Sequence, residues 1–252
     1  MIPVQLIGQR CSGTNYLERL ILSNVKDIHI SRQLCHKHLW NAEFRFDQPV
    51  DDHLIIIIVR NPYDWLRSVH RQPHHCPSLY GLPMEEFVIS PVEAYYGRNW
   101  NSADTQLQQS YLYPAAHRES FADVISMRNQ KVATMLRIQS EFTPKTAIVT
   151  LESLQENPKS TLSTIVNQLN LTAKPVFRSI NTYKKTSTPF RPTSYAALTP
   201  ETIALLQSEL NWSQEAALGY SPDLIPNNTG KSTFLTRHRI KRSFSSMQNK
   251  LL

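Results

Sequence analysis

The sequence predicts an α/β fold in three layers, with a mainly parallel sheet flanked by helices. Short apolar runs alternate with helical patterns along the chain, which is the order of successive βαβ units. The run LIIIIV at 54–59 is rich in β-branched residues and bounded by charge, as expected for a strand that helices cover on both faces. The chain has 252 residues, enough for one sizeable domain, which we place at 1–220.

The elements expected in the first third are a strand at 3–7, a helix at 15–25, a strand near 27–30, a strand at 54–59 and a helix at 63–70. Leu17, Leu20 and Ile21 share one face at helical spacing and so predict the first helix. Pro62 can begin the second helix, because the first helical turn has no use for the missing N–H.

The later elements expected are a short helix at 84–88, a long helix at 119–142, a strand and turn at 146–154, a helix at 158–169 and a helix within 198–212. Apolar residues recur at helical spacing through the long helix. Thr199 is placed as the N-cap of the last helix, with Pro200 as its first residue.

Two regions depart from this pattern. Residues 73–114 are rich in Pro, His, Tyr and Trp, and we expect an insertion there that shapes a substrate pocket. Residues 221–252 hold six Lys/Arg against one acid, out of a net charge of +7 for the chain. This basic tail is expected to be a weakly ordered terminus, and an acidic surface is the alternative partner.

Targeting signals and cysteine spacing bear on where the protein resides and on its redox state. The N-terminus lacks the basic segment and cleavage site of a signal peptide, and the longest apolar run is far short of the ~20 residues of a membrane span. We therefore expect a cytoplasmic protein. Three cysteines in no metal-binding spacing predict reduced thiols.

The first candidate anion site is the loop in VQLIGQRCSGTNYL at 4–17. Gly8 and Gly13 have the G-x-x-x-x-G spacing of a phosphate loop, but Thr14 and Asn15 replace its Lys and its magnesium-binding hydroxyl. The backbone N–H groups of such a loop, at the start of a helix, still converge on an anion.

The second candidate site is RNPYDWLRS at 60–68. Arg60 ends a buried parallel strand, which is where open α/β sheets bind ligands. A P-loop ATPase places an acid there to hold Mg²⁺, so a cation at this position indicates that the ligand brings the negative charge. Ser68 lies two helical turns farther on and can offer a hydroxyl to the same anion; a strand-end salt bridge is the alternative role for Arg60.

Together these segments resemble the sulfotransferases that use 3′-phosphoadenosine-5′-phosphosulfate (PAPS), a family with a P-loop-like fold. The similar segments lie at 8–17, 60–68 and 149–158, the last reading VTLESLQENP. In the family, the first loop cradles the 5′-phosphosulfate and the R-(D/N)-P segment with its Ser grips the 3′-phosphate. The resemblance implies that the donor is bound by Arg10, Cys11, Ser12, Gly13, Thr14, Asn15, Arg60 and Ser68.

The chain departs from the family in three places. Cys11 stands where the family has Lys or Arg before S-G-T, so the cation is displaced to Arg10. Leu151 replaces a Tyr, and the family's C-terminal Arg-Lys-Gly loop is not recognisable. Further donor contacts are open, with surface charge as the alternative role for the three candidates, Lys184, Lys185 and Arg191.

An acceptor needs a general base, and His is the usual choice near neutral pH. In the resembled family the base lies near the mouth of the loop, where the segment after the second strand would place His38, with His36 second and Lys37 as a spare cation. A metal pair completed by His74, His75 or Cys76 is the rival interpretation, but neither cluster has zinc-ligand spacing and no metal is required.

The sequence therefore predicts transfer of a sulfuryl group from PAPS to a hydroxyl or amine, on a small-molecule or carbohydrate acceptor. Nucleic acid is not expected as a partner. A nucleotide kinase or NTPase of the same fold is one alternative, and a non-catalytic protein that binds anions or membrane surfaces through its tail is another.

Overall fold

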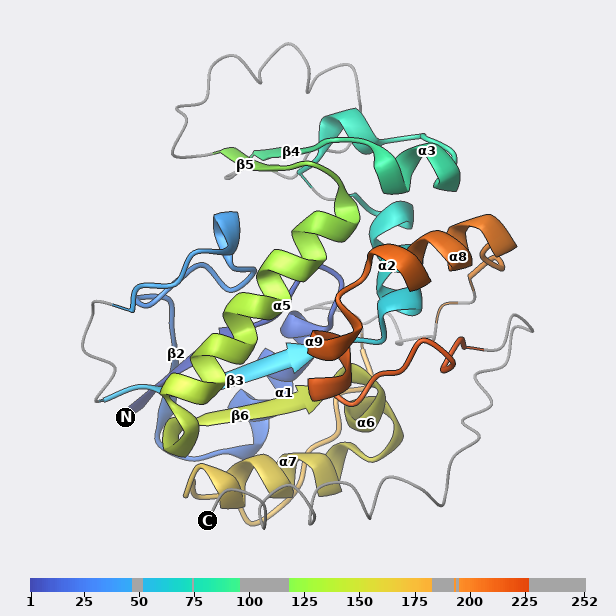
Figure 1. Cartoon of the computed structure of the whole chain (residues 1–252). Coiled ribbons are helices and arrows are strands. Elements are labelled where there is room, and N and C mark those ends of the chain that lie inside the picture. The colour runs from blue at the N-terminus through green and yellow to red at the C-terminus, as the bar shows by residue number, and fades with distance from the viewer. Residues whose placement is uncertain (47–51, 74, 96–117, 183–192, 194, 227–252) are drawn as a thin grey trace, which may run out of the picture.

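The computed structural model describes residues 1–46, 52–73, 75–95, 118–182, 193 and 195–226. A sheet of four parallel strands lies at its centre (Figure 1). The strands are β1 (Ile2–Ile7), β2 (Ile28–Ser31), β3 (Leu54–Val59) and β6 (Thr146–Thr150), in the order β2-β1-β3-β6. The predicted α/β fold with a parallel sheet flanked by helices is confirmed at this level.

The strand order places a topological switch point between β1 and β3. The chain passes from β1 to β2 on one side, and then returns to place β3 on the other side of β1. Ile7 pairs with Ile57, so the two strands end next to each other. Ligands of open α/β sheets bind beyond the carboxyl ends of strands at such a point.

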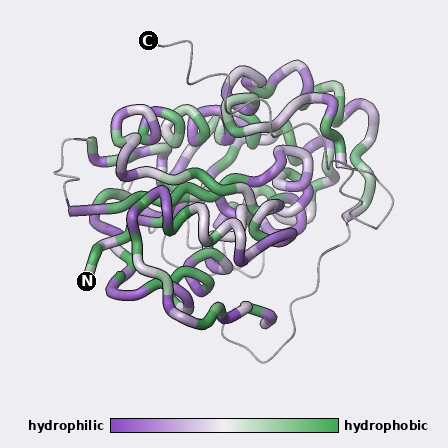
Figure 2. Tube along the Cα trace, turned by 90° about the horizontal axis from the view of Figure 1, so that it is seen from below, coloured by the Kyte–Doolittle hydropathy of each residue, from purple (hydrophilic) through white to green (hydrophobic). Residues whose placement is uncertain are grey.

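Helices cover both faces of the sheet (Figure 1). One face packs against α1 (Thr14–Asn24), α6 (Leu151–Glu156) and α7 (Pro158–Gln168), through a core that includes Leu17, Ile56, Leu154 and Ile165. The other face packs against α5 (Val124–Glu141), and its core also takes in Tyr220, which follows α9 (Trp212–Ala217). Figure 2 shows hydrophobic stretches running through the middle of the molecule.

A second apolar cluster lies beyond the carboxyl end of the sheet. It is built from α2 (Pro62–Arg71), α3 (Met84–Ile89), α8 (Pro200–Glu209) and the antiparallel pair β4 (Val92–Tyr95) and β5 (Arg118–Phe121). Trp65, Phe87 and Phe121 are buried in it. The partly buried Cys11 of the loop after β1 packs against this cluster.

Most elements expected from the sequence are present, but the long helix was predicted to start too early. Residues 118–121 form β5, where Phe121 pairs with Val92, and α5 begins only after Asp123, whose side chain caps it by accepting from Ser126 N at 2.6 Å. Apolar spacing alone does not distinguish a short strand from the first turn of a helix. The last helix ends at Glu209, so α9 is a separate element; Thr199 caps α8 as predicted.

The expected insertion and tail are described only in part. Within 73–114, the described residues include a 3₁₀ turn at Pro77–Leu79, α3 and β4. Residues 221–226 continue the packed chain, because Tyr63 Oη donates to Pro222 O at 2.8 Å and Ile225 packs on the second cluster. Among the described residues, no helix is both long and apolar enough to cross a membrane.

Replacing Gly13 tests how tightly the first loop is built. Gly13 has φ +91°, and a Cβ there would lie 2.6 Å from Leu151 Cδ1; Gly81 has a similar φ of +78° but no atom within 4 Å. Gly13→Ala should therefore lower the free energy of unfolding by about 2–4 kcal/mol, against about 1–2 for Gly81→Ala, because only the first adds overlap to backbone strain. Urea denaturation measures both, and equal losses would contradict the packing shown.

Candidate functional site

The loop of residues 8–13 lies at the switch point, pressed against the end of β3. A Cβ on Gly8 would lie 2.7 Å from Ile58 O and 2.8 Å from Thr14 Cγ2, so only glycine fits there. Cys11 and Gly13 have φ values of 65° and 91°, which turn the chain sharply into α1. The predicted strand, glycine loop and helix are therefore confirmed.

The start of α1 leaves donors for an anion. Gly13 is the N-cap of α1 and its O accepts from Tyr16 N and Leu17 N. Within the described chain, the N–H groups of Gly13, Thr14 and Asn15 donate to no acceptor. The helix dipole favours negative charge at this end.

Ser12 adds a hydroxyl to the same loop. Its side chain is 1% exposed, and its Oγ has no hydrogen-bond partner among the described residues. Buried polar atoms are nearly always satisfied, by protein, water or ligand. A ligand oxygen in the loop would satisfy this one, so the loop fits an anionic group.

Arg60 lies directly beside the loop. Its Nη1 donates to Cys11 O at 3.1 Å and its Nη2 to Tyr195 Oη at 3.3 Å, while its Nε has no partner within the described part of the chain. The backbone beyond it turns into α2, where Asn61 Oδ1 accepts from Tyr63 N at 3.0 Å. The two predicted anion sites are thus in contact through Arg60.

Cys11 and Ser68 meet on the α2 side of the loop. The Cys11 thiol lies 3.6 Å from Ser68 O, and Ser68 itself is buried in α2. Burial raises the pKa of Cys11, although the bond to Ser68 and the positive charge of Arg60 oppose the shift. The thiol is therefore protonated at neutral pH, which favours a small filling side chain over a reactive thiolate.

The segment with His36, Lys37 and His38 contacts the loop through Gly8 and Asn15, so it lies near the loop as expected. Gly8 N donates to Lys37 O at 2.8 Å, His38 Nδ1 lies 2.8 Å from Gly8 O, and Lys37 Nζ donates to Asn15 Oδ1 at 2.7 Å. Because a carbonyl only accepts, His38 Nδ1 carries the proton, which leaves Nε2 as an acceptor.

Both histidines are neutral at physiological pH. Burial lowers the pKa of His36 to about 4, helped by the positive charges of Arg10, Lys131 and Lys37. Burial also lowers the pKa of His38 well below its usual value, although its bond to Gly8 O opposes the shift. A neutral His38 can accept a proton without first losing one.

Arg10 does not point to the same side as Cys11. Its guanidinium pairs with the buried carboxylate of Glu119 at 3.2 Å and lies 5.3 Å from the centre of the Trp40 ring. Lys131 pairs with the other oxygen of Glu119 at 2.6 Å and donates to His38 O at 3.0 Å. Two buried cations against one carboxylate leave positive charge beneath the histidine segment.

Burial in this cluster also changes the pKa of the Lys131 ammonium. Desolvation lowers the pKa of Lys131 to about 8, with Arg10 in the same direction and Glu119 opposing it. Asn41 N donates at 3.0 Å to Glu119 Oε2, the oxygen that also pairs with Lys131. The cluster of Arg10, Glu119 and Lys131 therefore holds the 36–41 segment against the loop.

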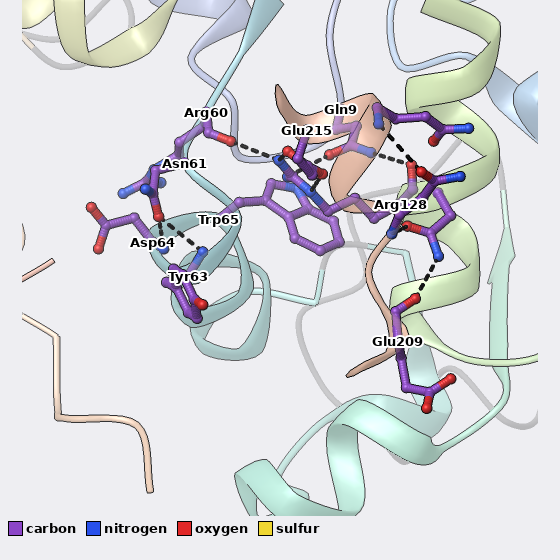
Figure 3. A network of polar contacts seen from close by, with 12 residues as sticks. Gln9, Arg60, Asn61, Tyr63, Asp64, Trp65, Arg128, Glu209 and Glu215 are labelled. Carbon is purple, nitrogen blue, oxygen red and sulfur yellow. Dashed lines mark hydrogen bonds and ion pairs between the residues drawn. The ribbon is translucent and has the colours of Figure 1, made fainter. Parts of the chain in front are cut away.

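A second buried network ties the loop to Arg60 (Figure 3). Arg128 is 1% exposed and pairs with Glu215 through two bonds of 2.6 and 2.8 Å. Its guanidinium also donates to Gln9 Oε1 at 3.1 Å and to Arg60 O at 2.9 Å. One side chain thereby fixes the loop and the end of β3 together.

The third similar segment, residues 149–158, contacts both anion sites through Glu152 and Leu151. Glu152 accepts from Asn61 N at 2.9 Å and from Tyr220 Oη at 3.1 Å. Leu151 packs against Gly13, the N-cap of α1. These contacts orient the second segment and leave no direct role at the loop for Glu152.

Of the residues predicted for the site, the structure brings together His36, Lys37, His38, Cys11, Ser12, Gly13, Thr14, Asn15, Arg60 and Ser68. Arg10 belongs to the loop through its backbone, but its side chain is turned to Glu119. Lys184, Lys185 and Arg191 lie outside the described residues.

The sequence interpretation missed several supporting residues, among them Glu119, Arg128, Lys131 and Glu215. A signal was present for two of them. Arg128 and Lys131 stand at helical spacing among the apolar residues of α5, where an exposed charge is not expected. Glu119 gave no such signal, because nothing in the local pattern shows that it is buried.

No group of three His, Cys, Asp or Glu able to hold a metal ion occurs in the part of the chain that the structure describes. Of the rival metal ligands, Cys76 accepts from Arg10 Nη1 at 3.6 Å, and His74 lies outside that part.

The sequence matches no model of a known protein family, and no curated protein is significantly similar to it.

Proposed function

We propose that the protein is a sulfotransferase that moves the sulfuryl group of PAPS to a hydroxyl or amine. The observation that carries the proposal is the contact of three features at one point. The free N–H groups of the α1 start, the Arg60 guanidinium and the His38 imidazole all adjoin the loop of residues 8–13. PAPS requires one site for its 5′-phosphosulfate and another for its 3′-phosphate, and the acceptor requires a base.

The reaction would break the bond between sulfur and the oxygen that links it to the 5′-phosphate. The acceptor oxygen or nitrogen forms the new bond to sulfur, and adenosine 3′,5′-bisphosphate leaves. Negative charge collects on the leaving phosphate, where the N–H groups of Gly13 and Thr14 and the Ser12 hydroxyl can stabilise it. Arg60 and Ser68 would hold the 3′-phosphate.

His38 is the proposed base. Its Nδ1–H is bound to Gly8 O, which fixes the ring and directs the Nε2 lone pair away from that carbonyl. The acceptor proton would pass to Nε2 as the new bond to sulfur forms. The net positive charge of the Arg10, Glu119 and Lys131 cluster favours an anionic donor nearby, so Arg10 would act at a distance.

The acceptor is proposed to be a small molecule or a carbohydrate with a hydroxyl or amine. The segment 73–114, which we expect to shape its pocket, is described only at 73 and 75–95. The three cysteines are free, in agreement with a cytoplasmic enzyme. A kinase or NTPase is less well supported, because Thr14 and Arg60 occupy the positions of its lysine and its acid.

Binding of the desulfated donor tests the proposal. The wild-type chain should bind adenosine 3′,5′-bisphosphate without added metal, and Arg60→Gln should weaken binding at least about tenfold, since it removes a charge-assisted contact. Isothermal titration calorimetry measures both, with Arg137→Gln as the control for loss of one positive charge elsewhere. An absence of binding to wild type, or Mg²⁺-dependent turnover of ATP, would overturn the proposal.

Turnover tests the base separately. His38→Gln should lower kcat by about 10²-fold or more while donor affinity stays the same, because the amide cannot accept a proton. Since the pKa of His38 lies well below 6.5 and that of Lys131 is about 8, the wild-type rate should also stay flat as the pH falls from about 7 to about 6.5. A variant with near-normal kcat would place the base elsewhere, with His36 next.

A further inference from the structure

A second arginine, Arg71, approaches the Arg60 side of the loop. It lies in the last turn of α2, is exposed, and donates through Nη1 to Thr193 Oγ1 at 3.0 Å. Its guanidinium carbon is 5.4 Å from the centre of the Tyr195 ring, and that of Arg60 is 5.5 Å from the same centre. Tyr195 therefore holds two cations at one place.

Three other arginines near this end of the sheet already have carboxylate partners. Arg10 pairs with Glu119, Arg67 with Asp64, and Arg128 with Glu215. Among the described residues, neither Arg60 nor Arg71 forms an ion pair with an acid. Two unneutralised cations on one aromatic ring repel each other, and a bound dianion would remove that repulsion.

The chain is built to keep this arrangement. Arg67 Nη1 donates to Ala196 O at 3.5 Å, and Arg71, one turn later on the same helix face, donates to Thr193. The two contacts hold Thr193 and Ala196 against α2, and the Tyr195 ring lies over Arg60. Ser68 lies three residues before Arg71, which brings its part of the helix to the same side.

We propose that Arg60 and Arg71, gathered by the Tyr195 ring beside α2, form a clamp for the 3′-phosphate of the donor. The inference rests on the proposed function and adds Arg71 and Tyr195 to its binding residues. Two guanidiniums bring two positive charges to one point, which matches the charge of a dianionic terminal phosphate. Arg71 is proposed to act on that phosphate and not on the 5′ group.

The test compares two nucleotides that differ only in the 3′-phosphate. Titration calorimetry on the full chain measures the affinity of adenosine 3′,5′-bisphosphate and of adenosine 5′-phosphate, for wild type, Arg71→Gln and Arg137→Gln. Arg71→Gln should weaken the bisphosphate about tenfold and leave the 5′-phosphate within about twofold of wild type. Arg137→Gln removes an equal charge from the exposed pair with Glu141 and should change neither affinity.

Tyr195 provides a second variant. Tyr195→Leu removes the ring that gathers both guanidiniums, and should also weaken the bisphosphate selectively, while Tyr195→Phe keeps the ring and should lose less. If Arg71→Gln behaves like Arg137→Gln, or weakens both nucleotides equally, the clamp is wrong while the proposed function stands. If wild type binds neither nucleotide, the proposed function fails and the clamp with it.

Discussion

The buried ion pair between Arg128 and Glu215 is the interaction on which the geometry of the site depends. The Arg128 guanidinium also donates to Gln9 in the loop and to the carbonyl of Arg60 at the end of β3 (Figure 3). Removing one partner of such a pair leaves an uncompensated charge in the interior, at a cost of about 3–5 kcal/mol. The loop and the strand end therefore hold one relative position, and the proposed anion site depends on it.

A second cluster gives the other side of the loop its charge. Arg10, Lys131 and Glu119 are buried together, and Lys131 also holds the carbonyl of His38. Burial, helped by this positive excess, keeps His36 neutral, and the excess also favours an anionic ligand nearby. The Arg128 and Glu215 network therefore fixes the distance between the two anion sites. The cluster of Arg10, Glu119 and Lys131 sets the electrostatic environment of the candidate base.

Local patterns were enough to predict the parts of the site that are adjacent in sequence. Glycine spacing after a strand predicted the loop, and the charge at the end of LIIIIV predicted the place of Arg60. The direction of Arg10 could not be predicted, because it is decided by Glu119, more than a hundred residues away, in a strand that the apolar pattern assigned to a helix. Contacts between distant segments leave no local signal unless a charge interrupts an apolar face, as Arg128 does in α5.

Arg128 positions the site by its forked set of hydrogen bonds as well as by its charge. Arg128→Lys keeps the buried charge but cannot reach Glu215, Gln9 and Arg60 O at once, and Arg137→Lys is the matched exposed change. Calorimetric affinity for adenosine 3′,5′-bisphosphate, measured where circular dichroism shows both variants folded, is the direct test. Arg128→Lys alone should weaken the affinity about tenfold or more. Equal affinities in the two variants would contradict it.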